Sequence, residues 1–140
     1  FGEEVKRRIL IGTFTLSAAS YDQYFMKAQQ VRRLIAEEYQ SVLKDVDVIA
    51  GPSAPNTAFV LNDDSKSITD MYMEDVFTIG ANLAGLPAMS VPAGLVDGLP
   101  VGMQLIGSRF GEAQLLNIAH QFQRRTDWHL LTPNLEGLTR

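Results

Sequence analysis

One stretch of the sequence decides the fold, residues 71–92: Met71-Tyr72-Met73-Glu74-Asp75-Val76-Phe77-Thr78-Ile79-Gly80-Ala81-Asn82-Leu83-Ala84-Gly85-Leu86-Pro87-Ala88-Met89-Ser90-Val91-Pro92. Its first part is largely apolar around one carboxylate, Asp75, and it breaks at Gly85-Leu86-Pro87 before a short apolar run. The pattern predicts a helix that leads into a strand. A carboxylate in an apolar segment is costly unless it is paired, bound to a ligand or exposed. What Asp75 faces is therefore the first functional question.

The flanking sequence alternates helical and extended patterns. It predicts helices at residues 3–18, 20–44, 71–84 and 112–125, and short strands at 46–50, 88–91 and 100–107. Two of the strands are rich in apolar residues on both faces, which is typical of a sheet covered by helices on both sides. The fold class is therefore α/β. A sheet of this kind normally has more strands than three, which suggests that the chain is a piece of a larger domain.

Local signals place several boundaries. Ser20 with Gln23 fits a capping box at the start of the second helix. Arg33 and Glu37 are four positions apart and can pair on its outer face. Thr69 or Asp70 can cap the helix that carries Asp75, and Asp97-Gly98 predicts a tight turn between the last two strands.

Composition excludes several classes of protein. The chain has 140 residues, of which 46% are hydrophobic and 20% charged, and its net charge is −4. These values fit one globular domain and give no reason to expect direct binding to nucleic acid. Cysteine is absent, which excludes thiol chemistry and fits a cytoplasmic protein. No apolar run is long enough to cross a bilayer, and His120 and His129 are too isolated to predict a metal site.

No catalytic or nucleotide-binding motif is visible. None of the serines lies in a Gly-x-Ser-x-Gly turn, and neither a Gly-x-Gly-x-x-Gly nor a Walker pattern occurs. The chain starts at Phe1-Gly2, without Met, and enters a helical pattern at once. We therefore expect a fragment of a longer protein.

Asp75 has two interpretations. It is either a surface carboxylate on the polar side of an amphipathic helix, or a carboxylate that receives a cationic group of a ligand. Helical spacing would set Met71, Thr78, Ile79 and Asn82 along the same side as Asp75. Glu74 would project about 100° away, so the two acids should not share a role.

The basic triplet Lys6-Arg7-Arg8 also has two interpretations. It is either a solvated helix face, or the source of one inward-pointing Arg that binds a carboxylate through two hydrogen bonds. One such Arg together with Asp75 would bind a zwitterion, with the guanidinium on its carboxylate and Asp75 on its ammonium group. This is the arrangement expected of an amino-acid pocket.

Several segments together carry a resemblance to a known family. They are FGEEVKRRI (1–9), GTFTLS (12–17), YDQYFMKAQQVR (21–32), DVIAGPSAP (47–55), residues 71–92, and LPVGMQLIG (99–107). The chain closely resembles the C-terminal part of the A subunits of glutamyl-tRNA(Gln) amidotransferases, which are amidase-signature proteins. The resemblance covers essentially residues 1–140. It implies a mixed sheet flanked by helices, with the catalytic half of the domain missing upstream.

The resemblance also implies an activity and its partners. The A subunit releases ammonia from glutamine through a Ser-cisSer-Lys triad. The B subunit, with ATP and magnesium, then uses the ammonia to convert Glu-tRNA(Gln) to Gln-tRNA(Gln), and the C subunit completes the complex. The triad is absent from this sequence, so the chain alone is expected to be inactive, to hold no cofactor of its own and to meet tRNA only through the complex.

In this family an Arg and an Asp bind glutamine, and they correspond to Arg8 and Asp75. The sequence leaves two alternatives open. One is a fragment of another amidase-signature amide hydrolase, and the other is a non-catalytic module that binds partner subunits. Since a sheet cut from a larger domain exposes an apolar patch or a bare edge, the isolated chain is also expected to self-associate.

Overall fold

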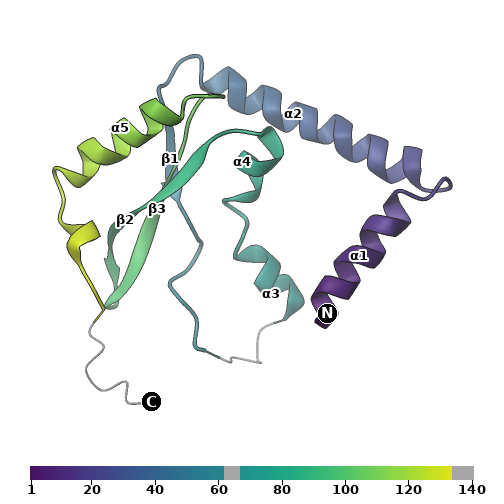
Figure 1. Cartoon of the computed structure of the whole chain (residues 1–140), viewed down its shortest axis with the longest axis horizontal. Helices are drawn as coiled ribbons and strands as arrows, with labels where there is room; N and C mark the ends of the chain where they lie inside the picture. The colour runs from purple at the N-terminus through teal and green to yellow at the C-terminus, as the bar shows by residue number, and fades with distance from the viewer. Residues whose placement is uncertain (62–66, 134–140) are drawn as a thin grey trace.

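A computed structural model describes residues 1–61 and 67–133 of the chain. In chain order, its elements are α1 (Glu3–Thr15), the π-helical segment η1 (Tyr21–Met26), α2 (Lys27–Val42), β1 (Ile49–Pro52), α3 (Ile68–Met73), α4 (Ile79–Ala84), β2 (Ala88–Val96), β3 (Leu99–Ile106), α5 (Glu112–Gln123) and the 3₁₀ turn η2 (Trp128–Leu130). Figure 1 shows the strands between α5 and the α3–α4 segment, with α2 running along one side. The predicted α/β class is confirmed.

The strands of the described residues form one antiparallel sheet of order β1-β3-β2. β2 and β3 form a hairpin because Asp97 and Gly98 both adopt positive φ, 51° and 79°, as a tight two-residue turn requires. At the other end of β3, Ile106 lies opposite both Ile49 and Ala88. The predicted turn is therefore confirmed, and β3 is the central strand.

Helices cover both faces of this sheet, as the sequence predicted. Successive side chains of a strand point to opposite faces. Leu105 accordingly packs in a buried cluster with Val91 and with Leu115 and Ala119 of α5. The next residue, Ile106, belongs to a second buried cluster formed by Ala81, Ala84 and Leu86, against which Ala36, Tyr39, Leu43 and Ile49 pack. β3 thus joins two small cores, one under α5 and one under α2 and α4.

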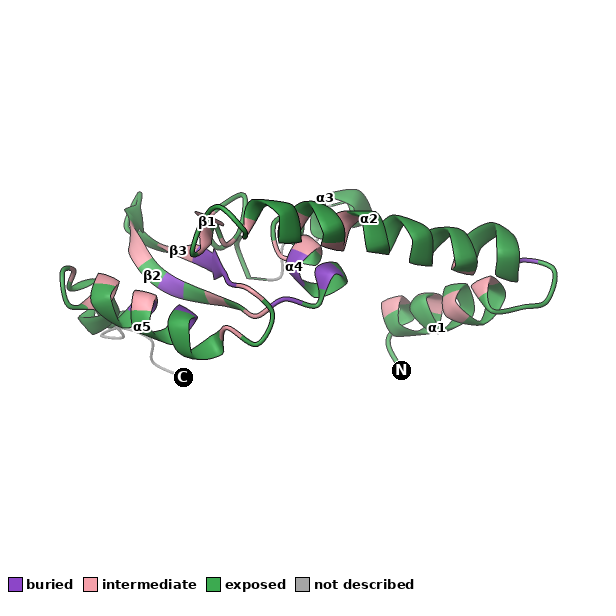
Figure 2. Ribbon diagram, turned by 90° about the horizontal axis from the view of Figure 1, so that it is seen from above, coloured by how far each residue is buried: buried purple, intermediate pink, exposed green. Residues whose placement is uncertain are grey.

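The N-terminal helices form an arm. Figure 2 shows α1 and the first half of α2 extending away from the sheet, with mostly exposed residues. Neither α1 nor α2 contains a buried residue. The predicted pair between Arg33 and Glu37 is present, with Nε and Oε1 3.4 Å apart. The arm is therefore attached to the rest of the chain at two places. α2 packs against α4, and α1 contacts Tyr72 of α3.

Four local predictions were wrong. Ser20 makes no side-chain capping bond to the helix that follows it, and that helix begins with the π-helical turn η1. The first strand is Ile49–Pro52, three residues later than predicted, because residues 46–48 do not join the ladder.

The helix predicted at residues 71–84 is two helices, α3 and α4, separated by turns at residues 74–78. In this break, the amides of Asp75 and Val76 bond to the carbonyls of Tyr72 and Met73, three residues back. Ser67, and not Thr69 or Asp70, caps α3. Its hydroxyl accepts a bond from the Asp70 amide, and the Asp70 carboxylate accepts one from the Ser67 amide, which completes a capping box.

Candidate functional site

A surface hollow of about 310 Å³ lies between α1 and α3. It is lined by Glu3, Glu4, Arg7, Arg8, Ile68, Met71, Tyr72 and Asp75. We call it the α1–α3 hollow. Its wall from α1 is charged, and Ile68 and Met71 from α3 make the opposite wall apolar. The two residues that the sequence singled out, Arg8 and Asp75, therefore line the same hollow from segments that are far apart in the chain.

The break between α3 and α4 decides which polar side chains reach this hollow. Met71 and Asp75 line it as the helical spacing predicted, but Thr78 and Asn82 line a different hollow beside Ser90 and Gln104. The prediction that Thr78 and Asn82 share one side with Met71 and Asp75 is therefore wrong, because residues 74–78 turn the chain. Glu74 lines yet another cavity, near Pro55 and Pro100, so the two neighbouring acids do have separate environments.

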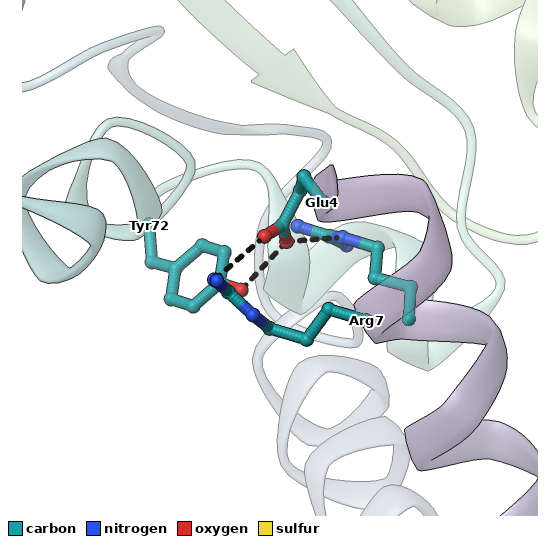
Figure 3. A network of polar contacts seen from close by, with 4 residues as sticks. Glu4, Arg7 and Tyr72 are labelled. Carbon is teal, nitrogen blue, oxygen red and sulfur yellow. Dashed lines mark hydrogen bonds and ion pairs between the residues drawn. The ribbon is translucent and has the colours of Figure 1, made fainter. Parts of the chain in front are cut away.

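Glu4 is the centre of a polar network in the α1–α3 hollow. Its Oε1 accepts hydrogen bonds from Arg8 Nε at 2.9 Å and from the Tyr72 hydroxyl at 2.6 Å. Its Oε2 accepts one from Arg7 Nη1 at 3.0 Å. In Figure 3, dashed lines join the Glu4 carboxylate to the side chains of Arg7 and Tyr72. The hydrogen bond from Tyr72, followed by that from Arg8, lowers the pKa of Glu4 below its ordinary value, so Glu4 is ionised near neutral pH.

Arg8 is held on two sides. The hydrogen bond with Glu4 raises the pKa of the Arg8 guanidinium above its ordinary value, and the charge of Asp75 is the weakest cause acting in the same direction. The central carbon of the guanidinium also lies 5.4 Å from the centre of the Tyr72 ring, within the range of a cation–π interaction. Arg8 is therefore a fixed positive charge with a defined orientation.

Arg8 and Asp75 do not form an ion pair with each other in the described residues. Both side chains are exposed to solvent at the hollow. Since Arg8 and Asp75 line one hollow and do not pair with each other, a ligand there can meet one positive and one negative group. A small zwitterion has the charges that match this arrangement.

The sequence analysis missed Glu4 and Tyr72 as members of this site. A signal for Glu4 was present, because Glu4 and Arg8 are four positions apart on a helix, the spacing at which opposite charges pair. No comparable signal exists for Tyr72, which is 68 positions away from Glu4 and meets it only in the folded chain.

The described part of the chain contains neither a metal site nor a membrane-spanning helix. In residues 1–61 and 67–133, no group of three or more His, Cys, Asp or Glu side chains has a geometry that could hold a metal ion. Within the same residues, no helix is both long enough and apolar enough to cross a membrane.

Sequence comparison defines the class of protein. The profile of the family described as Amidase matches residues 1–116, so this chain belongs to the amidase family. Among its relatives, the A subunit of glutamyl-tRNA(Gln) amidotransferase from Marinomonas sp. is 56% identical over 96% of this chain. The same protein from Saccharophagus degradans is 59% identical over 95% of it. In each case, the chain spans only 28% of the relative's length.

Solved structures agree with this assignment. The structure of the glutamyl-tRNA(Gln) amidotransferase A subunit from Thermotoga maritima matches 90% of this chain and 28% of its own, with 52% identity and a TM-score of 0.72. A bacterial aryl acylamidase of the amidase-signature family gives the same TM-score of 0.72 at 23% identity. The first match shows similarity in both sequence and fold, whereas the second shows similarity in fold alone.

Proposed function

We propose that this chain is the glutamine-holding part of the glutaminase subunit of a tRNA-dependent amidotransferase. The observation that carries the proposal is the shared α1–α3 hollow, in which Arg8 and Asp75 present opposite charges to one small volume. The identity of more than half of the residues with curated A subunits supports the same function.

In this proposal, Arg8 binds the α-carboxylate of glutamine. A guanidinium presents N–H groups in a planar fork that matches a carboxylate, and such charge-assisted bonds are about twice as strong as neutral ones. The raised pKa of Arg8 means that it keeps its proton at any working pH. The apolar side chains of Ile68 and Met71 line the same hollow and suit the methylene groups of the substrate.

Asp75 binds the α-ammonium group in the same proposal. It is exposed at the hollow and makes no ion pair among the described residues, so its charge is available to a ligand. Together, the two contacts would fix the α-carbon and thereby direct the side-chain amide toward a reaction centre. Binding and orientation are the contribution of these residues, since no bond of the substrate is broken by them.

The remaining parts of the reaction lie outside this chain. The Ser-cisSer-Lys triad that cleaves the amide would come from the rest of the longer protein. The ammonia would pass to the B subunit, which carries ATP and magnesium and amidates Glu-tRNA(Gln), while the C subunit completes the complex. The chain itself would bind no cofactor, would contact tRNA only through the complex and would act in the cytoplasm.

The test is glutamine hydrolysis by the full-length protein in complex with its partner subunits. Arg8→Ala should raise KM for glutamine about 10- to 150-fold, because charged hydrogen bonds contribute roughly 1.5–3 kcal/mol. Asp75→Asn should raise KM in the same range, and Arg8→Lys should recover part of the loss because it keeps the charge without the planar fork.

Arg33→Ala and Asp45→Asn are matched controls. Both residues are exposed and lie outside the α1–α3 hollow, so neither change should alter glutamine kinetics. Unchanged KM in both Arg8→Ala and Asp75→Asn would remove the assignment of this hollow as the glutamine site.

A further inference from the structure

Arg8 and Asp75 line one hollow with opposite charges, yet they do not pair in the described residues. The charge of Asp75 acts on the Arg8 guanidinium across this hollow, and opposite charges gain from direct contact. Direct pairing would neutralise both, and a ligand would then have to break that pair before it could bind. The guanidinium instead contacts Glu4 and the ring of Tyr72.

We propose that Glu4 and Tyr72 are positioning residues that hold the Arg8 guanidinium away from Asp75, so that both charges of the α1–α3 hollow stay available to an amino-acid zwitterion. This inference rests on the proposed roles of Arg8 and Asp75. It adds two positioning residues that act through Arg8.

The contact with Glu4 selects which edge of the guanidinium remains free. Glu4 Oε1 takes the Nε–H of Arg8 at 2.9 Å. A carboxylate can approach a guanidinium either along the side that includes Nε or at the end formed by the two terminal nitrogens. Since Glu4 occupies the Nε side, the end-on fork is left for a ligand.

Tyr72 fixes this arrangement from the opposite element. Its ring lies under the guanidinium, with 5.4 Å between the guanidinium carbon and the ring centre. Its hydroxyl donates to the same Glu4 oxygen that accepts from Arg8. One residue of α3 therefore contacts both members of the Glu4–Arg8 pair and limits rotation of the guanidinium toward Asp75.

The charges of the network are also consistent with this role. Glu4 accepts hydrogen bonds from both Arg7 and Arg8, so one carboxylate offsets part of two positive charges. Glu3 is paired with Lys6 at 2.8 Å. Because Glu3 and Glu4 offset part of the positive charge of α1, the hollow attracts simple anions less strongly. This favours a ligand that carries one positive and one negative charge.

A double-mutant cycle in the full-length protein, in complex with its partner subunits, tests the inference. The readouts are KM and kcat for glutamine, and the inhibition constant of glutaramate, which keeps the carboxylate and the amide of glutamine but lacks the ammonium group. Glu4→Gln and Tyr72→Phe are each made in the natural background and in the Asp75→Asn background. Glu37→Gln and Tyr21→Phe are matched controls, because Glu37 pairs with Arg33 Nε and Tyr21 is as exposed as Tyr72, at 40%.

With Asp75 present, Glu4→Gln should raise the KM for glutamine and the inhibition constant of glutaramate about fivefold, the upper range for an exposed ion pair, and change kcat less than twofold. With Asp75→Asn, the Glu4→Gln effect on glutaramate should fall below twofold, because Arg8 no longer has a carboxylate to collapse onto. Tyr72→Phe should show the same dependence on Asp75 with a smaller amplitude.

Two results would overturn the inference. One is an equal loss of glutaramate binding in both backgrounds, which a merely structural role of Glu4 would give. The other is a Glu4→Gln variant that binds glutaramate normally while Arg8→Ala does not. If Arg8→Ala itself leaves glutaramate binding unchanged, the proposed function fails, so the two failures are distinguishable.

Discussion

The hydroxyl of Tyr72 donates a 2.6 Å hydrogen bond to Glu4, a residue 68 positions earlier in the chain. This bond joins α1 to α3 and closes one side of the α1–α3 hollow. α1 buries none of its residues and packs on η1 at its other end through Phe14 and Tyr24, so this bond fixes the N-terminal end of the helix against α3. The geometry of the site thus depends on a polar contact between exposed side chains.

This contact has a testable pH dependence. The hydrogen bond from Tyr72 is the main cause that lowers the Glu4 pKa below its ordinary value of 4.5. For a carboxyl with a lowered pKa in the folded state, the stabilising contribution is complete above the ordinary pKa and is lost as the pH falls through the lowered one. A carbon-detected NMR titration should therefore give a Glu4 midpoint below 4.5, and Tyr72→Phe should move it upward. An identical midpoint in Tyr72→Phe would contradict this explanation.

Leu105 should contribute much more to stability than Leu99 on the same strand. Leu105 is 2% exposed and packs under α5, whereas Leu99 is 41% exposed. Leu105→Ala removes a buried side chain and leaves a cavity, which costs about 2–5 kcal/mol in the free energy of unfolding. Leu99→Ala should cost less than about 1 kcal/mol, since surface changes have small effects. Urea unfolding followed by circular dichroism measures both, and equal losses would contradict the placement of the core.

The sequence predicted the regular elements better than the contacts between them. Short apolar runs identified the strands, apolar residues on both faces predicted cover by helices on both sides, and Asp97-Gly98 identified the hairpin, because these signals are local. The break between α3 and α4 was missed since residues 74–78 contain neither Pro nor Gly to mark it. Of the site, the residue pattern singled out Asp75 and the triplet Lys6-Arg7-Arg8, and the family resemblance selected Arg8 from that triplet. Tyr72 could not be predicted, because its partners, Glu4 and Arg8, belong to α1 and are far from it in the sequence.

The hairpin turn supplies a third test. Gly98 has a φ of 79°, a conformation that costs a residue with a Cβ about 1–2 kcal/mol. Gly98→Ala should therefore lower the free energy of unfolding by about that amount, as measured by the same urea titration. Gly51→Ala is the matched control, because Gly51 has no positive φ and an added Cβ there meets no atom within 4 Å. A Gly51→Ala loss equal to that of Gly98→Ala would contradict the role of the turn conformation.

The isolated chain should self-associate in solution. Large apolar side chains are exposed along the arm, including Leu10 at 69%, Phe14 at 57% and Leu34 at 53%. β1 and β2 are the two edges of the sheet within the described residues, and each edge leaves backbone groups open to another strand. A net charge of −4 gives only weak repulsion between copies. Sedimentation velocity should show average mass rising with protein concentration.

Two variants test whether the apolar arm causes this association. Leu10→Lys with Phe14→Lys places positive charges on α1, at positions outside the α1–α3 hollow, and should shift association to higher concentration if the arm mediates it. Lys44→Glu alters the charge of an exposed residue after α2 without changing the apolar arm, and should leave association unchanged. A single monomeric species at every concentration of the unmodified chain would show that neither the exposed helix nor the open edges drive contact between copies.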